Sequence, residues 1–190
     1  MLAKLRRVQA LATVAILLAV SGCVTSRVSG ELLVDKPPRV REVEVTVRYR
    51  AYEGNNMAAR MGQAGLDNLM PHLRARVPTV FSLNGIPATL NEAASGIYGK
   101  EPPPIRPGVT NLVLFPVSAT HSTGGGLSLH LEASLVNPTT SKAFWHGYIT
   151  LSTIGGKFDE GVADKVAVKL LDQMRADKLV RLPAKEIRTQ

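Results

Sequence analysis

Strict alternation of apolar and polar residues marks the second half of the chain. Residues 127–135 carry Leu or Ala at every odd position, with Ser, His or Glu between them. Residues 144–151 alternate similarly, and residues 112–115 form a short apolar run. Period-two alternation predicts strands with one buried face, and the apolar run predicts a strand covered on both faces. Turns at 122–126 and 137–140 would join the three strands into an antiparallel meander.

A four-residue apolar repeat follows the meander and predicts a helix over residues 159–178. One wide apolar stripe on this helix contains Val162, Ala163, Val166, Ala167, Leu170, Leu171 and Met174. Asp159 and Glu160 lie where a helix dipole favours negative charge, and Lys178 lies where it favours positive charge. After the helix, we expect a short edge strand at 179–182.

The first half of the chain is less regular. Residues 42–50 alternate as in a half-buried strand, and Met57–Met70 places apolar residues on one helical face. Pro71 is expected to end or kink this helix, because proline lacks the N–H that a helix interior needs. We expect a second strand at Val77–Leu83. The proline-rich stretch 84–108 then predicts an irregular loop, a candidate for partner contact.

These elements predict an α+β fold. Their order is β-α-β, loop, β-β-β-α, which indicates a mixed, largely antiparallel sheet with two helices packed on one face. We expect a single domain at 42–182 and a polar tail at 183–190. Residues 23–41 hold small polar residues and the pair Pro37-Pro38 without sustained periodicity, so we expect them to form a tether.

The first 22 residues have the composition of a secretory signal peptide. Met1–Arg7 contains three basic residues and no acidic one, and an apolar run follows over residues 8–20. That run is shorter than the roughly 20 residues of a comfortable membrane span. Cleavage of this segment would leave a chain of 168 residues.

Val20-Ser21-Gly22-Cys23 closely resembles a bacterial lipobox. The resemblance implies an S-diacylglyceryl group on Cys23, cleavage between Gly22 and Cys23, and a fatty acyl chain such as palmitate on the new amino group. Two or three long acyl chains would hold the protein on a membrane essentially permanently. Val24, where an Asp would favour inner-membrane retention, implies by resemblance to Gram-negative lipoproteins an outer-membrane location facing the periplasm.

Charge and cysteine content narrow the function classes. The net charge of the whole chain is +8, with 23 basic and 15 acidic residues. Loss of Lys4, Arg6 and Arg7 with the signal peptide leaves a diffuse charge of about +5, which gives poor support for nucleic-acid binding. Cys23 is the only cysteine, which excludes an intrachain disulfide framework and a cysteine-based zinc cluster.

No catalytic constellation stands out. The chain has no Gly-x-Ser-x-Gly elbow, and we expect neither an enzyme nor a bound cofactor. One alternative is a metal-binding protein or hydrolase that uses His130, Glu132 and His146, which alternation places on one polar sheet face. Another is a carrier of an apolar ligand between sheet and helices. Trp145 is expected in the core or at its boundary.

A second, remote resemblance concerns residues 137–151. A strand–turn–strand with Trp145 at the start of the strand before a long amphipathic helix is similar to small α/β domains of periplasmic lipoproteins. These include activator lipoproteins of cell-wall synthases and the amino-terminal domain of the Tol system's soluble protein. The resemblance implies a non-enzymatic component that binds a protein partner in the cell envelope, in addition to the membrane lipid held through Cys23.

Overall fold

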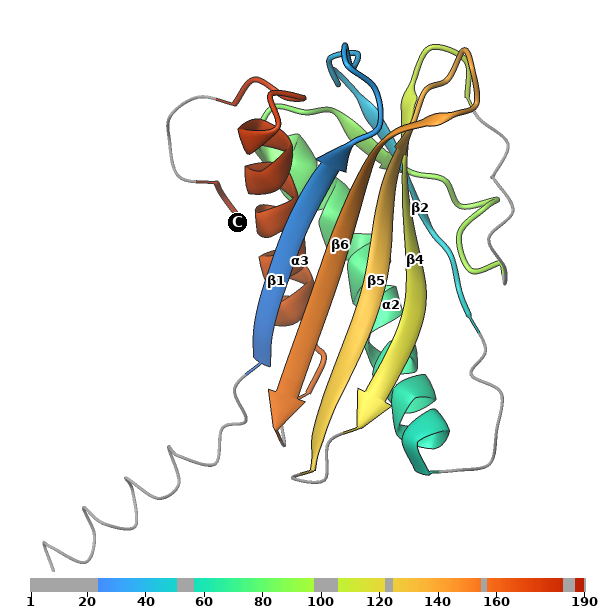
Figure 1. The fold of residues 1–190 in the computed structure, drawn as a ribbon, viewed down its shortest axis with the longest axis vertical. Coiled ribbons are helices and arrows are strands. Elements are labelled where there is room, and N and C mark those ends of the chain that lie inside the picture. Colours follow the sequence, from blue (N-terminus) through green and yellow to red (C-terminus); the bar gives the residue numbers. More distant parts are fainter. Residues whose placement is uncertain are drawn as a thin grey trace, which may run out of the picture.

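A computed structural model describes residues 24–50, 57–97, 106–121, 125–154, 157–182 and 187–189. Within these ranges the elements are, in chain order, β1 (Val24–Leu32), β2 (Val43–Val47), α2 (Met57–Leu83), β3 (Ala88–Leu90), β4 (Thr110–His121), β5 (Gly126–Val136), β6 (Ala143–Ile154) and α3 (Glu160–Ala176). The strands form one mixed sheet in the order β1-β6-β5-β4-β2-β3. Both helices cover the same face of this sheet, so the predicted α+β class is confirmed (Figure 1).

The predicted meander forms the centre of the sheet. Strand β4 pairs antiparallel with β5, and β5 pairs antiparallel with β6. On the other side of β4, strands β2 and β3 run parallel to it and to each other. A register shift between Pro116 and Ser118 marks a bulge in β4, where proline has no N–H to donate to its neighbour.

Helix α2 contradicts the prediction of a second strand at Val77–Leu83. The helix runs through Pro71 and Pro78 and reaches Leu83. Its buried side chains continue one helical stripe past both prolines: Leu66, Leu69, Met70, Leu73, Val77, Val80 and Phe81. Pro71 is exposed and Pro78 half-buried, so the carbonyls that lose their helical partners lie on the side away from the stripe. Burial of the stripe against the sheet outweighs the cost of the two prolines.

Strand β1 contradicts the prediction of a tether over residues 23–41. It pairs antiparallel with β6 over its whole length, from Val24 opposite Thr153 to Leu32 opposite Trp145. Every second residue of β1 is half-buried, and the inward-facing Val24 and Val28 pack against the core. Helix α3 packs against β1 as well. Residues 24–32 are therefore part of the folded sheet.

The side chain of Trp145 on β6 contacts both β1 and the end of α3. Its side chain is fully buried, as expected, and its Nε1 donates a hydrogen bond of 2.7 Å to Asp177 Oδ2 at the end of α3. The indole ring lies over Gly147, where an added Cβ would be only 2.4 Å from the ring. Gly30 of β1 pairs with Gly147, and an added Cβ there would lie 2.7 Å from Trp145 Nε1. Two paired glycines thus make room for the indole.

Helix α3 matches its prediction closely. Asp159 is the N-cap, and its Oδ1 accepts a hydrogen bond of 3.1 Å from the backbone N–H of Val162. The stripe predicted from Val162 to Met174 is buried along its full length. Residues 179–182 do not form the predicted edge strand, although Leu179 is buried and its carbonyl accepts a hydrogen bond from Val40 N.

The described part of the predicted polar tail, residues 187–189, folds back onto α2. Asn84 exchanges two hydrogen bonds of 2.9 Å with the backbone of Arg188. Arg76 donates to the carbonyl of Thr189 at 2.7 Å. This stretch is therefore part of the packed domain rather than a free tail.

Candidate functional site

The predicted lipidation motif, Val20 to Cys23, lies outside the described residues. In the sequence, Cys23 directly precedes Val24, the first residue of β1. A lipid on Cys23 would be attached within one residue of the sheet. Within the described ranges, neither helix combines the length and apolar character needed to cross a bilayer.

The face of the sheet opposite the helices carries the polar side chains of the meander. Figure 1 looks onto this face, which we call the open face. Three rows of cross-strand partners lie on it: Arg27–Thr150–His130–Ser118, Ser29–Tyr148–Glu132–Phe115 and Glu31–His146–Ser134–Val113. None of the helices or strands of the described residues packs over these rows.

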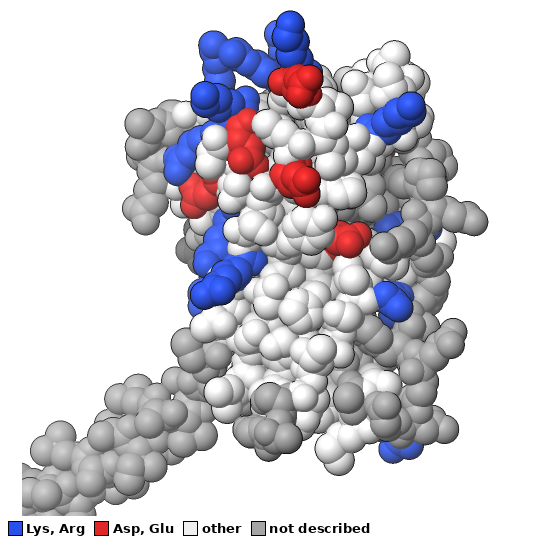
Figure 2. Space-filling view, in the orientation of Figure 1, with Lys and Arg blue, Asp and Glu red and all other residues white. Residues whose placement is uncertain are grey.

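The chemistry of the open face is mainly that of hydroxyl and aromatic groups. Ser128 Oγ and Ser152 Oγ lie 2.7 Å apart across β5 and β6, and Thr150 Oγ1 lies 3.3 Å from His130 Nδ1. Tyr148 stands at the centre of the middle row with 45% of its surface exposed. Figure 2 shows that the lower part of this face is largely uncharged, while Lys, Arg, Asp and Glu gather toward its upper end and its edges.

The candidate metal ligands lie on this face, as alternation predicted. His130 is opposite Thr150, Glu132 is opposite Tyr148, and His146 is opposite Ser134. Each of the three candidate ligands is therefore directly opposite a hydroxyl-bearing residue of the neighbouring strand and not opposite another candidate. Among the described residues, no group of three or more His, Cys, Asp or Glu side chains is arranged to hold a metal ion. The geometry gives the metal-site alternative no support.

The described parts of the predicted loop 84–108 hold short regular structure. Strand β3 pairs with β2, and the backbone N–H groups of Asn91 and Gly96 donate to Val45 O and Val47 O. Ser95 Oγ accepts a hydrogen bond of 3.1 Å from Val47 N. Residues 88–96 therefore cover the outer edge of β2. The remaining part of the predicted loop, 98–105, lies outside the described residues.

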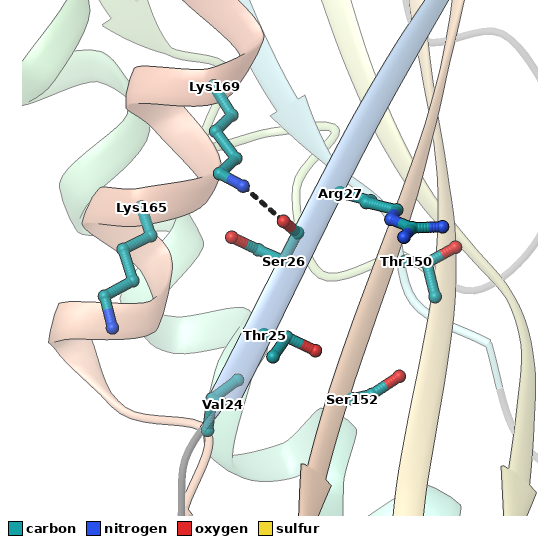
Figure 3. A pocket seen from close by; sticks show the side chains of 8 residues that line it. All are labelled: Val24, Thr25, Ser26, Arg27, Thr150, Ser152, Lys165 and Lys169. Atoms are coloured by element: carbon teal, nitrogen blue, oxygen red, sulfur yellow. Dashed lines mark hydrogen bonds between the residues drawn. The ribbon is translucent and has the colours of Figure 1, made fainter.

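A groove of about 760 Å³ follows the opposite edge of the sheet, along the first half of β1. Its lining residues are Val24, Thr25, Ser26, Arg27, Thr150, Ser152, Lys165 and Lys169. Figure 3 shows Lys169 reaching from α3 to β1 and Lys165 extending alongside α3, while Arg27 and Thr25 project on the other side of the strand toward β6. Lys169 Nζ donates a hydrogen bond to the carbonyl of Ser26. We call this feature the β1 groove.

Sequence reasoning missed the β1 groove because it requires β1 and α3 to be neighbours. Residues 24–29 do alternate Val, Ser, Val with Thr, Arg, Ser, which is a weak period-two signal. The interior between sheet and helices is filled by fully buried side chains such as Leu69, Leu129 and Val166. The β1 groove lies at the edge of the sheet, outside this packed interior.

One charged cluster joins the two helices on the covered face. Arg76 of α2 forms a two-pronged contact with Asp164 of α3, with Nε–Oδ1 at 2.6 Å and Nη2–Oδ2 at 3.1 Å. Glu160 Oε1 lies 3.2 Å from Arg76 Nη1. The hydrogen bond to Asp164 is the main cause that raises the pKa of Arg76 above its usual value. The cluster is a structural clamp, and its acids are already engaged with Arg76.

No protein-family model and no curated protein matches this chain. Among solved structures, the PelC dodecamer from Paraburkholderia phytofirmans in space group P6 is 14% identical, with a TM-score of 0.40. A single-residue variant of the same dodecamer in space group C2 is 15% identical, with a TM-score of 0.39. Each comparison covers 80% of this chain and 96% of the other. At these scores the similarity assigns neither a fold family nor a function.

Proposed function

We propose that this protein is a lipid-anchored lipoprotein of the outer membrane, facing the periplasm, that binds a protein partner in the cell envelope. The proposed anchor is the acylated Cys23, and the proposed binding surface is the open face. The observation that carries the binding proposal is the middle row of this face. There Tyr148, nearly half exposed, lies between Ser29 of β1 and Glu132 of β5, and no helix or strand of the described residues packs over it.

The composition of the open face fits a protein partner better than a nucleic acid. Cores of protein interfaces are depleted in charged residues and enriched in tyrosine, with polar residues at the rim. The largely uncharged lower part of the open face, with charges toward one end and the edges, has this arrangement (Figure 2). A nucleic-acid surface would instead carry a basic patch across it.

Site-specific photocrosslinking in cells tests the binding surface. A photoreactive amino acid replaces Tyr148 on the open face or, as a matched control, the exposed Thr79 on the outer side of α2. We expect one discrete crosslinked product from position 148 and none from position 79. Equal products from both positions, or none from position 148, would contradict the proposed surface.

The anchor is tested independently of the partner. The intact mass of the mature chain purified from membranes should correspond to cleavage before Cys23 plus a diacylglyceryl group and one acyl chain. Cys23→Ser removes the thiol that would receive the lipid, and we expect the unmodified precursor to accumulate. A mature chain without lipid mass on Cys23 would overturn the anchor.

A further inference from the structure

We propose that the β1 groove binds the phosphate headgroups of anionic lipids, so that the domain sits directly on the membrane surface with the start of β1 toward the bilayer. This inference rests on the proposed lipidation of Cys23 and adds a second, electrostatic contact to it. The contact would orient the domain as well as hold it.

The absence of a tether places the groove at the headgroup level. A bilayer has about 5–8 Å of headgroup region on each side of its hydrocarbon core. A strand rises about 3.4 Å per residue, so Val24 lies about 3 Å, Thr25 about 7 Å and Ser26 about 10 Å along the strand from the attachment point at Cys23. Val24, Thr25 and Ser26 all line the groove. With the acyl chains of Cys23 in the hydrocarbon, this part of the groove is level with the lipid phosphates.

The groove offers the chemistry that a phosphate group needs. Three positive charges flank β1 along the groove, Lys165 and Lys169 on the α3 side of the strand and Arg27 on the other side, and none of the lining residues is acidic. The hydroxyl groups of Thr25, Ser26, Thr150 and Ser152 add hydrogen-bond donors. The nearby acids of α3 have other partners, because Asp159 caps the helix and Glu160 and Asp164 contact Arg76.

The edge of β1 supplies backbone donors as well. Leu33 N donates a hydrogen bond to Phe144 O. In this register the odd-numbered residues of β1 therefore point their backbone N–H and C=O groups toward β6. Even-numbered residues of β1 therefore point their N–H and C=O groups outward into the groove, in agreement with the hydrogen bond from Lys169 to Ser26 O. The outward N–H groups of Val24 and Ser26 face the same side as the lysines.

Apolar side chains at the same end of the domain fit contact with a membrane. The start of β1, the end of β6 and the first turn of α2 all lie at this end (Figure 1). Ile154 ends β6 with 73% of its surface exposed, and Met57 begins α2 with 71% exposed. Among the exposed large apolar side chains of the described residues, these two are the most exposed.

Hydrogen–deuterium exchange of the chain purified from membranes tests the proposal. The protein is placed in nanodiscs of phosphatidylcholine alone or with phosphatidylglycerol, and exchange is followed in peptides covering residues 24–30. We expect slower exchange in the anionic discs by about fivefold or more, because each Lys or Arg near an anionic surface contributes about fivefold in affinity. High salt should abolish the difference, since it screens the attraction.

Charge-matched variants make the test specific. Lys165→Gln with Lys169→Gln removes two exposed charges beside the groove, and Lys142→Gln with Lys178→Gln removes two exposed charges elsewhere. Protection should be lost in the first pair and retained in the second. Equal exchange in neutral and anionic discs, or equal loss in both pairs, overturns the proposal.

Two further measurements separate the possible failures. Inorganic phosphate added to the detergent-solubilised chain should give no protection, and protection by free phosphate without protection in anionic discs overturns a lipid ligand. Intact mass is recorded on the same sample. Lipid mass on Cys23 without protection overturns only the groove, whereas a chain without lipid mass overturns the proposed anchor and this inference together.

Discussion

At the scale of single residues, Trp145 packs closely against two glycines that leave no space for a Cβ. An added Cβ on Gly30 would lie 2.3 Å from Asp177 Oδ2, and one on Gly147 would lie 2.4 Å from the indole ring. Overpacking of this kind costs about 1–3 kcal/mol. We expect Gly30→Ala and Gly147→Ala each to lower the free energy of unfolding by that amount in urea titrations. Gly161→Ala, whose nearest neighbour would be 3.5 Å away, is the control and should be neutral or stabilising.

The hydrogen bond from Trp145 to Asp177 predicts a second effect at this scale. Asp177→Ala leaves the buried indole N–H without its acceptor, which costs about 1–3 kcal/mol. Asp177→Asn keeps an oxygen acceptor and should lose less. Equal unfolding midpoints for the two variants would contradict a role for this hydrogen bond.

At the scale of elements, the sequence predicts those parts whose apolar pattern is both strong and uninterrupted. The meander and α3 are such parts, and their predicted ranges agree closely with the structure. The strand predicted at Val77–Leu83 is wrong, because Pro71 favours an end to the helix while the buried stripe continues past it from Leu66 to Phe81. Strand β1 was missed because Ser26 and Gly30 occupy inward positions without any hydrophobic signal.

A candidate surface could be predicted from the sequence only where the strands and helices that form it could be predicted. Alternation alone placed His130, Glu132 and His146 on one face, since that face belongs to two well-predicted neighbouring strands. The β1 groove could not be predicted, because it combines a missed strand with a helix that lies more than 130 residues away along the chain.

The path of α2 through its prolines leads to a prediction of its own. Proline inside a helix costs about 3 kcal/mol, and alanine restores the missing backbone hydrogen bond. We therefore expect Pro71→Ala and Pro78→Ala to raise the thermal unfolding midpoint, with gains of about 1–3 kcal/mol in stability. A loss of stability in both variants would contradict a continuous helix.

Strand β1 is tested by two identical substitutions three residues apart. The N–H of Ser29 faces β6, whereas that of Ser26 faces the outer edge. Proline is tolerated at an edge strand only where its missing N–H faces outward. We expect Ser29→Pro to destabilise the protein markedly more than Ser26→Pro in urea unfolding. Equal effects would show that β1 does not pair with β6 in this register.

At the scale of the whole molecule, the cluster around Arg76 connects helix α2 with helix α3 and with residues 187–189 near the C-terminus. Arg76 contacts Asp164, Glu160 and the carbonyl of Thr189. Hydrogen bonds to charged groups contribute about 1.5–3 kcal/mol. A double-mutant cycle with Arg76→Gln and Asp164→Asn should give a coupling energy of about 1–2 kcal/mol. A coupling near zero would mean that the three segments are held together by apolar packing alone.

The pairing of β1 with β6 also has a mechanical consequence. If Cys23 holds the lipid, any pull between membrane and domain enters the protein at the first residue of β1 and runs along the strand. Hydrogen bonds of an antiparallel pair lie across the strands, so such a pull loads the bonds along all nine residue pairs together in shear. A pull directed across the strands would instead load these hydrogen bonds one after another. The anchor would thus transmit force to the whole sheet, and the domain would resist extraction as a unit.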